Sequence, residues 1–400
     1  MICCHDGAGL GHTWRGLQIA SHVAESLVDS STLILSDLQA ISRLRFPQNV
    51  DYVHLPGIVR GSQQDYEARS LNLDLQNVLR IRRRIILSVA KNFKPDVIIF
   101  EGDPHILSPE MTRILASLKD KVLQTRIVWA LPDILGESRA VRRQWAQGNV
   151  YEMLNQYCDE IWIYGSRGVF DLIREYEVPR TIADRLCYTG YLQPPAVSSN
   201  LEQKHLAPMD SSLPLVLVTA GSGVNGFNLI NNYLTFLERN NGHTAIQSMV
   251  FTGPMMSSGE KRALLARAQK LSKVTFRRFS KHFLAYMRNA DLVVGTGGYN
   301  TMCEILSFGK KAILVPPPEH LNEHRLRAEV FHNLGLVELL RPEALNANHL
   351  EEKIRSALAT PSPTSDRDYP HMLSMDGLEN VIDRIKALTS AEQCSLSSGI

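Results

Sequence analysis

The chain has 400 residues, 44% of them hydrophobic, and a formal net charge of +2. This length allows two or three domains with full hydrophobic cores. The net charge is too small to indicate a nucleic-acid-binding protein, and no apolar run reaches the roughly 18 residues that a membrane-spanning helix needs. The six cysteines form no CxxC pair, and Met1 leads into a short strand with no signal region before it, so a reducing cytoplasm is expected.

Short apolar runs alternate with amphipathic segments along the chain, which is typical of parallel sheets with crossover helices. In the first half, strands are expected at 2–5, 32–36, 52–55, 96–100, 126–131, 160–165 and 185–190. In the second half, strands are expected at 214–221, 249–253, 274–279, 291–295, 312–316 and 336–340. A stretch rich in Pro, Ser and Asn separates the two halves and is a linker candidate.

The predicted fold class is therefore α/β, with two Rossmann-like domains. The first covers residues 1–190, a linker covers 191–212, and the second domain covers 213–360. Residues 361–400 are expected to form a loop, a C-terminal helix that packs back toward the first domain, and a frayed tail.

The most informative stretch, Asp291 to Pro318, is predicted as strand, glycine turn, helix and strand. The turn is Gly-Thr-Gly-Gly at 295–298, and the first turn of the helix contains Asn300 and Thr301. Glycines let a ligand approach the backbone closely, and the N–H groups and positive end of a helix attract a phosphate. Glu304, about a turn further on, is placed to accept hydrogen bonds from a ribose diol. The stretch predicts a nucleotide site.

Two further glycine turns follow predicted strands. The first spans His5 to His12 and opens a helix expected at 14–27. The second, 221–226, matches the dinucleotide pattern G-x-G-x-x-G, which also needs an acidic residue after the next strand. No acidic residue follows the strand that comes after this second turn. For the first turn, Asp37 is a candidate acidic residue, but His12 stands in place of the third glycine. A dinucleotide-dependent oxidoreductase is therefore an alternative to be weighed.

Together the three turns resemble those of the GT-B glycosyltransferases, most closely family 28 and the bacterial peptidoglycan N-acetylglucosaminyltransferase. The resemblance covers most of the chain in order, from Gly9-x-Gly11-His12 to the block 274–328. Its strongest part is Gly297-Gly298-x-x-Thr301-x-x-Glu304, followed by Glu323-His324-x-x-Arg327-Ala328. The resemblance implies two Rossmann-like domains facing across a central cleft, with the acceptor on the first and a nucleotide sugar on the second.

On the nucleotide side, the resemblance implies backbone contacts of the second glycine turn with the pyrophosphate, a uracil beside residues 279 and 280, and sugar contacts from residues 323 and 324. An arginine that close relatives place after the linker glycine is missing, so Arg278, Lys281 or Arg325 would have to supply a phosphate contact. The predicted donor-binding residues are Gly221, Ser222, Gly223, Phe279, Ser280, Gly297, Gly298, Asn300, Thr301, Glu304, Glu323 and His324.

On the acceptor side, polar residues follow the strands of the first domain. His12 is predicted as the general base because its reference pKa lies near neutrality, and Asp133 is the second candidate. The non-catalytic alternatives are that His12 caps a helix or lies in the core, and that the carboxylates are ordinary loop residues. The other predicted acceptor-side residues are Gly9, Gly11, Trp14, Glu101 and Asp103.

The departing diphosphate is expected to be stabilised by helix N-termini, so neither a metal nor another cofactor is predicted. His320-x-x-Glu323-His324 spells an inverted zinc-protease motif. It follows three prolines inside the predicted nucleotide domain, and no third ligand stands at a suitable spacing. A zinc peptidase is therefore a less favoured alternative.

The predicted function is transfer of a hexose from a nucleotide diphosphate sugar, expected to be a UDP-sugar, to an unidentified small-molecule, lipid-linked or peptide acceptor. The transfer is expected to proceed with inversion. A UDP-N-acetylglucosamine 2-epimerase and a non-catalytic nucleotide-binding protein remain alternatives. The cluster Arg80, Arg82, Arg83 and Arg84, on a helix expected from about Tyr66 to Asn92, is a solvated face or a contact with an anionic membrane. The expected location is the cytoplasm, with possible peripheral contact at the inner membrane face.

Overall fold

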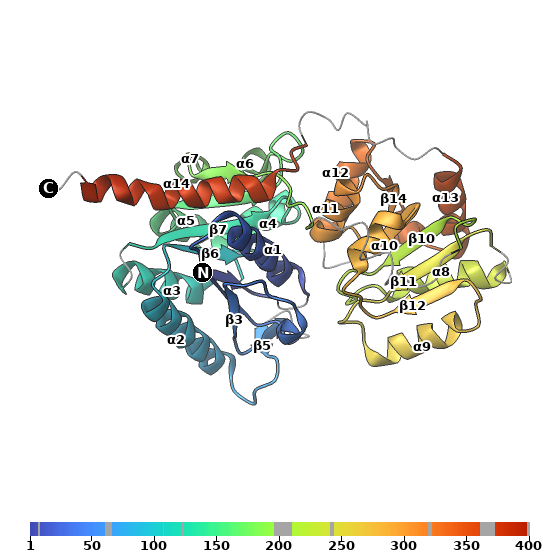
Figure 1. Cartoon of the computed structure of the whole chain (residues 1–400), viewed down its shortest axis with the longest axis horizontal. Helices are drawn as coiled ribbons and strands as arrows, with labels where there is room; N and C mark the ends of the chain where they lie inside the picture. The colour runs from blue at the N-terminus through green and yellow to red at the C-terminus, as the bar shows by residue number, and fades with distance from the viewer. Residues whose placement is uncertain are drawn as a thin grey trace. The chain divides into compact units, whose positions relative to one another are not determined.

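The computed structural model describes residues 1–6, 9–60, 66–106, 108–121, 124–195, 210–240, 244–318, 322–360 and 373–397. The chain divides into two compact units (Figure 1). Unit 1 contains Met1–Leu192 and Met372–Ile400, and unit 2 contains Gln193–His371. Each unit is built around one parallel sheet with helices, which confirms the predicted α/β class. Most of the predicted linker and nearly all of the predicted loop after residue 360 lie outside the described residues.

The main sheet of unit 1 has the strand order β3-β2-β1-β6-β7-β8-β9, and all neighbours run parallel. Every residue of β6 and β8 is buried, as expected for strands that helices cover on both faces. The order reverses between β1 and β6, which is where ligands of such sheets bind, at the carboxyl ends of the strands. The strands are β1 (Ile2–Cys4), β2 (Thr32–Ser36), β3 (Val50–His54), β6 (Val97–Glu101), β7 (Arg126–Pro132), β8 (Glu160–Tyr164) and β9 (Leu186–Tyr188).

Two groups of helices cover this sheet. On one face α1 packs against α14, β1 and β2, while on the other α2, α3 and α5 pack in a row over the main hydrophobic core. The helices of unit 1 are α1 (Gly11–Ser26), η1 (Ile41–Arg43), α2 (Leu75–Phe93), α3 (Ser108–Lys121), α4 (Ser138–Gln147), α5 (Val150–Tyr157), α6 (Leu172–Glu175), α7 (Arg180–Ala183) and α14 (Gly377–Ser397).

The start of α2 differs from the prediction. Residues Tyr66–Ala68 form β5, which pairs antiparallel with β4 (Ile58–Arg60). The helix begins only at Leu75, because the carboxylate of Asp74 accepts a hydrogen bond from a backbone N–H of its first turn. The predicted helix start at Tyr66 is therefore wrong by about two turns.

Unit 2 repeats the arrangement with the strand order β12-β11-β10-β13-β14-β15, all parallel, and the order reverses between β10 and β13. Its strands are β10 (Leu215–Thr219), β11 (Gln247–Phe251), β12 (Val274–Arg277), β13 (Leu292–Gly295), β14 (Ala312–Leu314) and β15 (Glu338–Leu339). Its helices are α8 (Phe227–Arg239), α9 (Ser258–Ala268), α10 (Phe283–Asn289), α11 (Tyr299–Ser307), α12 (Asn322–Asn333), η3 (Pro342–Ala344) and α13 (Ala347–Ala359).

The last helix, α14, belongs to unit 1 although it follows unit 2 in the sequence (Figure 1). The backbone N–H of Gly377 donates to the carbonyl of Tyr191, and the side chain of Asn380 donates to the carbonyl of Thr189. Arg384 forms an ion pair with Glu160 at the start of β8. Among the described helices, none combines the length and the apolar character needed to cross a membrane.

Candidate active site

In unit 2, the glycine turn after β10 packs directly on the turn after β11. Gly223 has a φ of 98°, and a Cβ atom there would lie 2.3 Å from the carbonyl oxygen of Thr252. Only glycine fits such a position. The turn ends at Gly226, the N-cap of α8, which has no side chain to satisfy the first N–H groups of the helix. Those groups remain available to an anion.

The second glycine turn of unit 2 follows β13 and is held by a buried arginine. The guanidinium of Arg327, from α12, is fully buried and donates to the carbonyl of Gly297 over 3.3 Å. It also lies 5.7 Å from the ring centre of Tyr299, at the start of α11. Arg327 belongs to the motif that carried the resemblance, but its structural role could not be predicted, because its partner Gly297 is 30 residues away in the sequence.

The two turns and the start of α12 meet at the carboxyl edge of the sheet. A Cβ atom on Gly221 would lie 3.8 Å from the hydroxyl of Thr296, and one on Gly298 would lie 3.4 Å from the imidazole of His324. The His324 Nε2 lies 3.4 Å from the carboxylate of Glu323. Predicted residues from three distant segments thus come together where β10 and β13 reverse the strand order.

Glu304, in the second turn of α11, is a buried titratable group of unit 2. Its side chain is only 7% exposed, and burial raises its pKa to about 8. No described residue donates a hydrogen bond or a salt bridge to its carboxylate. A buried carboxyl group without a partner is costly, and a strongly shifted pKa is typical of a functional site.

The remaining predicted residues of this side lie along the same edge. Asn300 and Thr301 occupy the first turn of α11. Phe279 and Ser280 follow β12, where Phe279 is 52% exposed and the hydroxyl of Ser280 accepts a hydrogen bond from the N–H of His282. Arg278, one of the candidate phosphate contacts, donates to the carbonyl of Pro254 over 2.9 Å.

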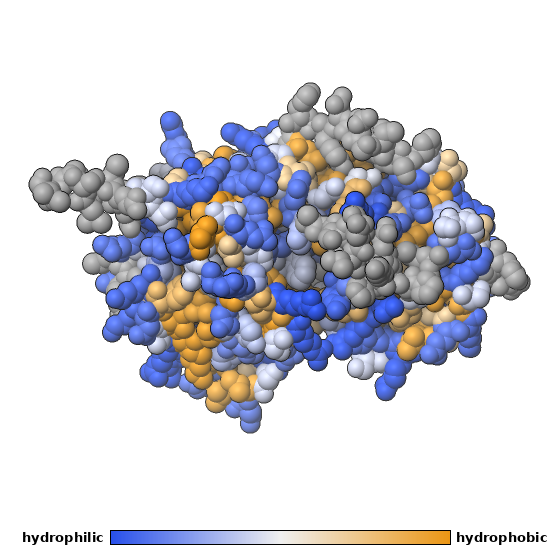
Figure 2. All heavy atoms as spheres, in the orientation of Figure 1, coloured by the Kyte–Doolittle hydropathy of each residue, from blue (hydrophilic) through white to orange (hydrophobic). Residues whose placement is uncertain are grey.

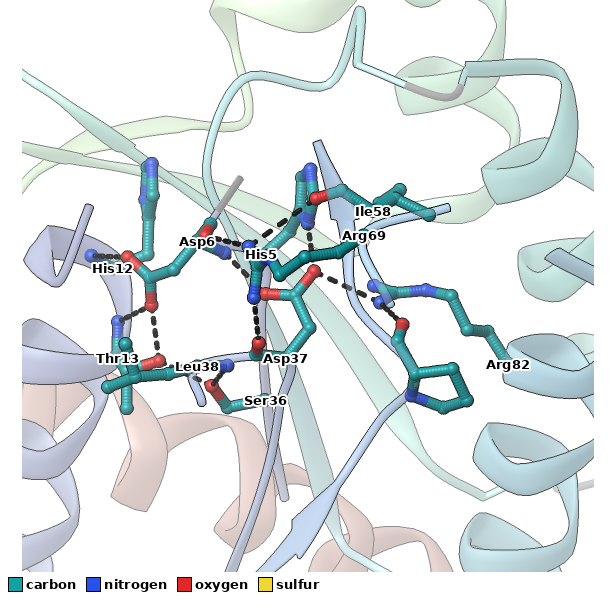
Figure 3. Close-up of polar contacts among 11 residues, drawn as sticks. His5, Asp6, His12, Thr13, Ser36, Asp37, Leu38, Ile58, Arg69 and Arg82 are labelled. Atoms are coloured by element: carbon teal, nitrogen blue, oxygen red, sulfur yellow. Dashed lines mark hydrogen bonds and ion pairs between the residues drawn. The ribbon is translucent and has the colours of Figure 1, made fainter. Parts of the chain in front are cut away.

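In unit 1, the N-terminus of α1 is capped by the loop that precedes it. Asp6 accepts hydrogen bonds from the backbone N–H groups of His12, at 3.0 Å, and Thr13, at 2.7 Å (Figure 3). The hydroxyl of Thr13 also donates to it. A carboxylate is favourable at this end of a helix. The helix end that would attract an anionic ligand is therefore occupied by the chain itself.

His12 contacts Glu101 at the reversal point, a pairing that was not predicted from the sequence. Its Nδ1 is 3.2 Å from Oε1 of Glu101 and 2.7 Å from Nη2 of Arg15. The Nε of Arg15 lies 2.5 Å from the same Oε1. Arg15 is absent from the predicted site, although its spacing of three residues from His12 on a helix indicates that the two share a face.

A second cluster surrounds Asp37, at the end of β2 (Figure 3). Its Oδ2 is 2.6 Å from Nδ1 of His5 and 3.0 Å from Arg82, and its Oδ1 accepts the N–H of Asp6. Burial alone would raise the pKa of Asp37, but the hydrogen bond and charge of His5, the charge of Arg82 and the N–H of Asp6 hold it below its usual range.

This cluster corrects two expectations. Asp37 is fully buried and engaged, so it does not present its carboxylate to the ribose of a dinucleotide. Arg82 is buried as well, so the basic run of α2 is not one solvated face. Both errors have the same cause, since these side chains find partners on strands and loops distant in the sequence.

The other acceptor-side candidates are largely engaged. Asp133 is 2% exposed, and its two oxygens accept from the N–H of Ile134 and the hydroxyl of Tyr191. Asp103 accepts from the indole N–H of Trp145. The other residues of this set are the half-buried Trp14 beside His12 and the glycines Gly9 and Gly11 at the start of α1. Of the two predicted bases, His12 is the accessible one, with 28% of its side chain exposed.

Both units thus place polar groups at the reversal point of a Rossmann-like sheet, as in proteins of the GT-B fold. Crystal structures agree with this fold. The chain aligns over 97% of its length with 98% of Acinetobacter baumannii MurG, at a TM-score of 0.57 and 13% identity. It aligns with the spinosyn forosaminyltransferase SpnP over 97% of this chain and 98% of that one, at a TM-score of 0.64 and 11% identity.

Sequence comparison narrows the class. Residues 215–370, within unit 2, match the glycosyltransferase family 28 C-terminal domain. The chain is also 22% identical, over 87% of its length and 90% of the relative, to the UDP-N-acetylglucosamine–N-acetylmuramyl-(pentapeptide) pyrophosphoryl-undecaprenol N-acetylglucosamine transferase of Pediococcus pentosaceus. The chain is a glycosyltransferase of the GT-B fold, and its unit 2 carries a family 28 C-terminal domain. The resemblance predicted from the motifs is confirmed.

The metal predictions stay predictions. Among the described residues, no group of three or more His, Cys, Asp or Glu side chains is arranged to hold a metal ion. His320 of the inverted zinc-protease motif lies outside the described residues. The expectation that no Asp-x-Asp sequence occurs in the chain is wrong, because Asp366-Arg367-Asp368 is one, and it too lies outside the described residues.

Proposed function

We propose that the chain transfers a hexose from a UDP-sugar to an acceptor, with inversion at the anomeric carbon and without a metal. The observation that carries this proposal is Glu304, a buried carboxyl group whose pKa is raised by burial and to which no described residue donates, one turn inside a helix whose N-cap is a glycine. A bound nucleotide would supply hydrogen-bond partners for the carboxyl group of Glu304 and for the first N–H groups of the helix. Its phosphates bind to N–H groups of the glycine turns, and its ribose hydroxyls donate to the carboxylate.

On the nucleotide side, catalysis requires that the leaving diphosphate be stabilised as its charge grows. The open first turns of α8 and α11 offer fixed N–H groups and the positive ends of two helix dipoles. Arg327 fixes the second of these turns through the carbonyl of Gly297. EDTA is therefore expected to leave the transfer activity intact.

On the acceptor side, a hydroxyl must lose its proton as its oxygen attacks the anomeric carbon. Unit 1 offers imidazole groups at the carboxyl edge of its sheet for this task. The Pediococcus relative is named for a pyrophosphoryl-undecaprenol substrate, and on that likeness we propose a lipid-linked acceptor.

The proposal predicts a loss of nucleotide affinity when Glu304 is truncated. Glu304→Ala is expected to weaken UDP binding by roughly 1.5–3 kcal/mol, the usual value of hydrogen bonds to a charged acceptor. Calorimetric titration of the folded protein with UDP measures this. Glu343→Ala, at an exposed position of the same unit, is the control and should bind UDP normally. Unchanged affinity in Glu304→Ala would remove Glu304 from the site.

Incubation with UDP-hexoses alone separates the alternatives that share this fold. A transferase releases UDP slowly by hydrolysis and does not exchange the hydrogen at C2. An epimerase forms the C2 epimer, and a binding protein retains the nucleotide sugar without turnover. Formation of C2 epimers would replace the transfer proposal.

A lipid-linked acceptor also suggests where the protein works, and we propose peripheral contact with the cytoplasmic face of an anionic membrane. Hydrophobic atoms gather over α2 and the loop before it (Figure 2). Leu71 and Leu73 are each 45% exposed and Ile81 is 37% exposed. Arg80 and Arg84, on α2 together with Ile81, are exposed as well. Apolar groups with flanking arginines suit the surface of an anionic bilayer.

Sedimentation with lipid vesicles tests this contact. The protein is expected to sediment with vesicles that contain an anionic lipid more than with purely zwitterionic ones. Exchanging Leu71 and Leu73 for serine should abolish most of that binding, whereas Val28→Ser, at the most exposed large hydrophobic residue of unit 1, should not. Equal sedimentation of all three proteins would refute the proposed surface.

A further inference from the structure

His5 follows β1 and His12 lies in the first turn of α1, and their neighbours set opposite tautomers for the two rings. Figure 3 shows the rings of His5 and His12 projecting to the same side of the sheet edge. Building on the proposed glycosyl transfer, we propose that His5 takes the proton from the acceptor hydroxyl, while His12 acts as a hydrogen-bond donor. From the sequence, His12 is predicted as the base, so this proposal moves that role to His5 and gives His12 a different one.

For His12 the decisive neighbour is Arg15. A guanidinium is always charged and has no lone pair to offer, so every contact it makes is a donation. At 2.7 Å from Nη2 of Arg15, the Nδ1 of His12 must be the acceptor. The proton of the neutral ring then sits on Nε2. In that tautomer Nε2 can donate a hydrogen bond, but it cannot take up a proton.

The carboxylate of Glu101 does not reverse this assignment. Its Oε1 lies 3.2 Å from Nδ1 of His12, but it already accepts the Nε of Arg15 at the shorter distance of 2.5 Å. The side chains of Arg15 and Glu101 are 5% and 1% exposed, so their ion pair is held in place. A proton on Nδ1 of His12 would point at the guanidinium.

For His5 the decisive neighbour is Asp37, with the opposite effect. A carboxylate is an acceptor only, and its Oδ2 lies 2.6 Å from Nδ1 of His5. Arg82 and the N–H of Asp6 donate to the same carboxylate, which keeps it ionised. The Nδ1 of His5 therefore carries a proton, and the lone pair of the neutral ring is on Nε2. The side chain of His5 is 17% exposed.

The chemical step then divides between the two rings. The acceptor oxygen forms a bond to the anomeric carbon as the bond from that carbon to the diphosphate oxygen breaks. The electron pair of the broken bond leaves with UDP, and the acceptor proton moves to Nε2 of His5. Asp37 stabilises the imidazolium that forms. His12, through Nε2–H, donates to an acceptor oxygen and orients it.

The tautomers are directly observable by NMR, independently of any activity. Long-range 1H–15N spectra of the 15N-histidine-labelled protein, at a pH where the histidine signals no longer shift, distinguish protonated from unprotonated ring nitrogens. We expect an unprotonated Nε2 in His5 and a protonated Nε2 in His12, with the signals assigned from His5→Gln and His12→Gln. An unprotonated Nε2 in His12 would overturn the proposal.

Kinetics of glutamine and alanine variants provide the second test, because a glutamine amide donates hydrogen bonds but does not take up a proton at neutral pH. Turnover should fall by roughly 10²–10⁴ in both His5→Gln and His5→Ala, as for loss of a general base. At position 12, glutamine should retain at least tenfold more turnover than alanine. His54→Gln, at the exposed end of β3, is the control.

The outcomes separate this proposal from the function on which it rests. If His5→Gln keeps full turnover while His12→Gln is as inactive as His12→Ala, the base is His12 and the exchange of roles is wrong. If the wild-type protein binds no UDP in calorimetry, the proposed transfer itself fails, whatever tautomers the NMR spectra show.

Discussion

The sheets of the two units have the same order in their first six strands. The units differ in what satisfies the first N–H groups of the helices that follow their glycine turns, α1 in unit 1 and α8 and α11 in unit 2. In unit 1 the first N–H groups of α1 are satisfied by the carboxylate of Asp6. In unit 2 the N-caps of α8 and α11 are Gly226 and Gly298, which carry no side chain. The Rossmann-like topology thus fixes where a site lies. The residues of the loop decide whether the helix end binds a ligand or its own chain.

The two units also differ in whether their buried titratable groups have partners. The charged groups around the reversal point of unit 1 have partners, as in the ion pairs of Glu101 with Arg15 and of Asp37 with Arg82. In unit 2, Glu304 is buried and has no such partner among the described residues. The ion pairs of unit 1 hold its carboxylates ionised, whereas unit 2 has a carboxyl group that burial keeps protonated and that a ligand can satisfy. Removing a charge should have opposite effects on the two units.

The largest effect is expected when Glu304 is made neutral. Its pKa is raised from 4.5 to about 8 in the folded protein, so its protonated form favours folding. That contribution is fully present below pH 4.5 and is lost as the pH rises through 8. At pH 9, Glu304→Gln should therefore be more stable than the wild type by up to about 5 kcal/mol, an upper limit that follows from the shift.

Hydrogen exchange of the unit 2 strands at pH 5 and pH 9, without nucleotide, measures this difference. The advantage of Glu304→Gln should be small at pH 5 and should grow toward pH 9. A difference that does not change with pH would mean that Glu304 is ionised in the folded protein and has a partner.

The next largest effect is expected from Asp6. Asp6→Ala removes a buried carboxylate that accepts from two backbone N–H groups and one hydroxyl, so it should lower the free energy of unfolding of unit 1 by about 2–4 kcal/mol. All four tryptophans lie in unit 1, so their fluorescence in a denaturant titration reports this unit alone.

A matched control is the exposed N-cap of α2. Asp74→Ala removes the same kind of cap and should cost only about 1 kcal/mol. Equal losses in the two variants would mean that Asp6 acts as an ordinary surface cap and that the contrast between the units is smaller than described.

The smallest effect is expected in the glycine turn of unit 2. Gly223→Ala places a Cβ atom against the carbonyl of Thr252 at a positive φ and should destabilise unit 2 by roughly 1–3 kcal/mol and weaken UDP binding. Gly259, near the start of α9, has open space around it, so Gly259→Ala should be neutral or slightly stabilising. Normal UDP binding by Gly223→Ala would remove this turn from the phosphate site.

The sheets were predictable because buried parallel strands have continuous runs of apolar residues in the sequence. Every expected strand overlaps a strand of the main sheets, down to the short β15. The hairpin of β4 and β5 was missed because its strands have three residues each and carry no apolar run. The start of α2 was misplaced although Asp74, a typical N-cap residue, marks it in the sequence.

The two sites differ in how much the sequence reveals. On the nucleotide side the motif is local, since the glycine turn after β13 and Glu304 lie within ten residues of one another. On the acceptor side, Asp37 is 32 residues from His5 and Glu101 is 89 residues from His12. Such pairs form only when the strands are placed side by side, so residue type and spacing could not predict them.

The return of α14 to unit 1 has a consequence for the order in which the protein is made. Unit 2 is one continuous segment, so it can fold as soon as it leaves the ribosome. Most of unit 1 is synthesised first. Its Glu160 can form the ion pair with Arg384, and its Tyr191 carbonyl can accept the N–H of Gly377, only after α14 has been made. A nascent chain therefore carries an incomplete unit 1 until α14 is made, and a stop codon before α14 would leave unit 2 whole and unit 1 without its last helix.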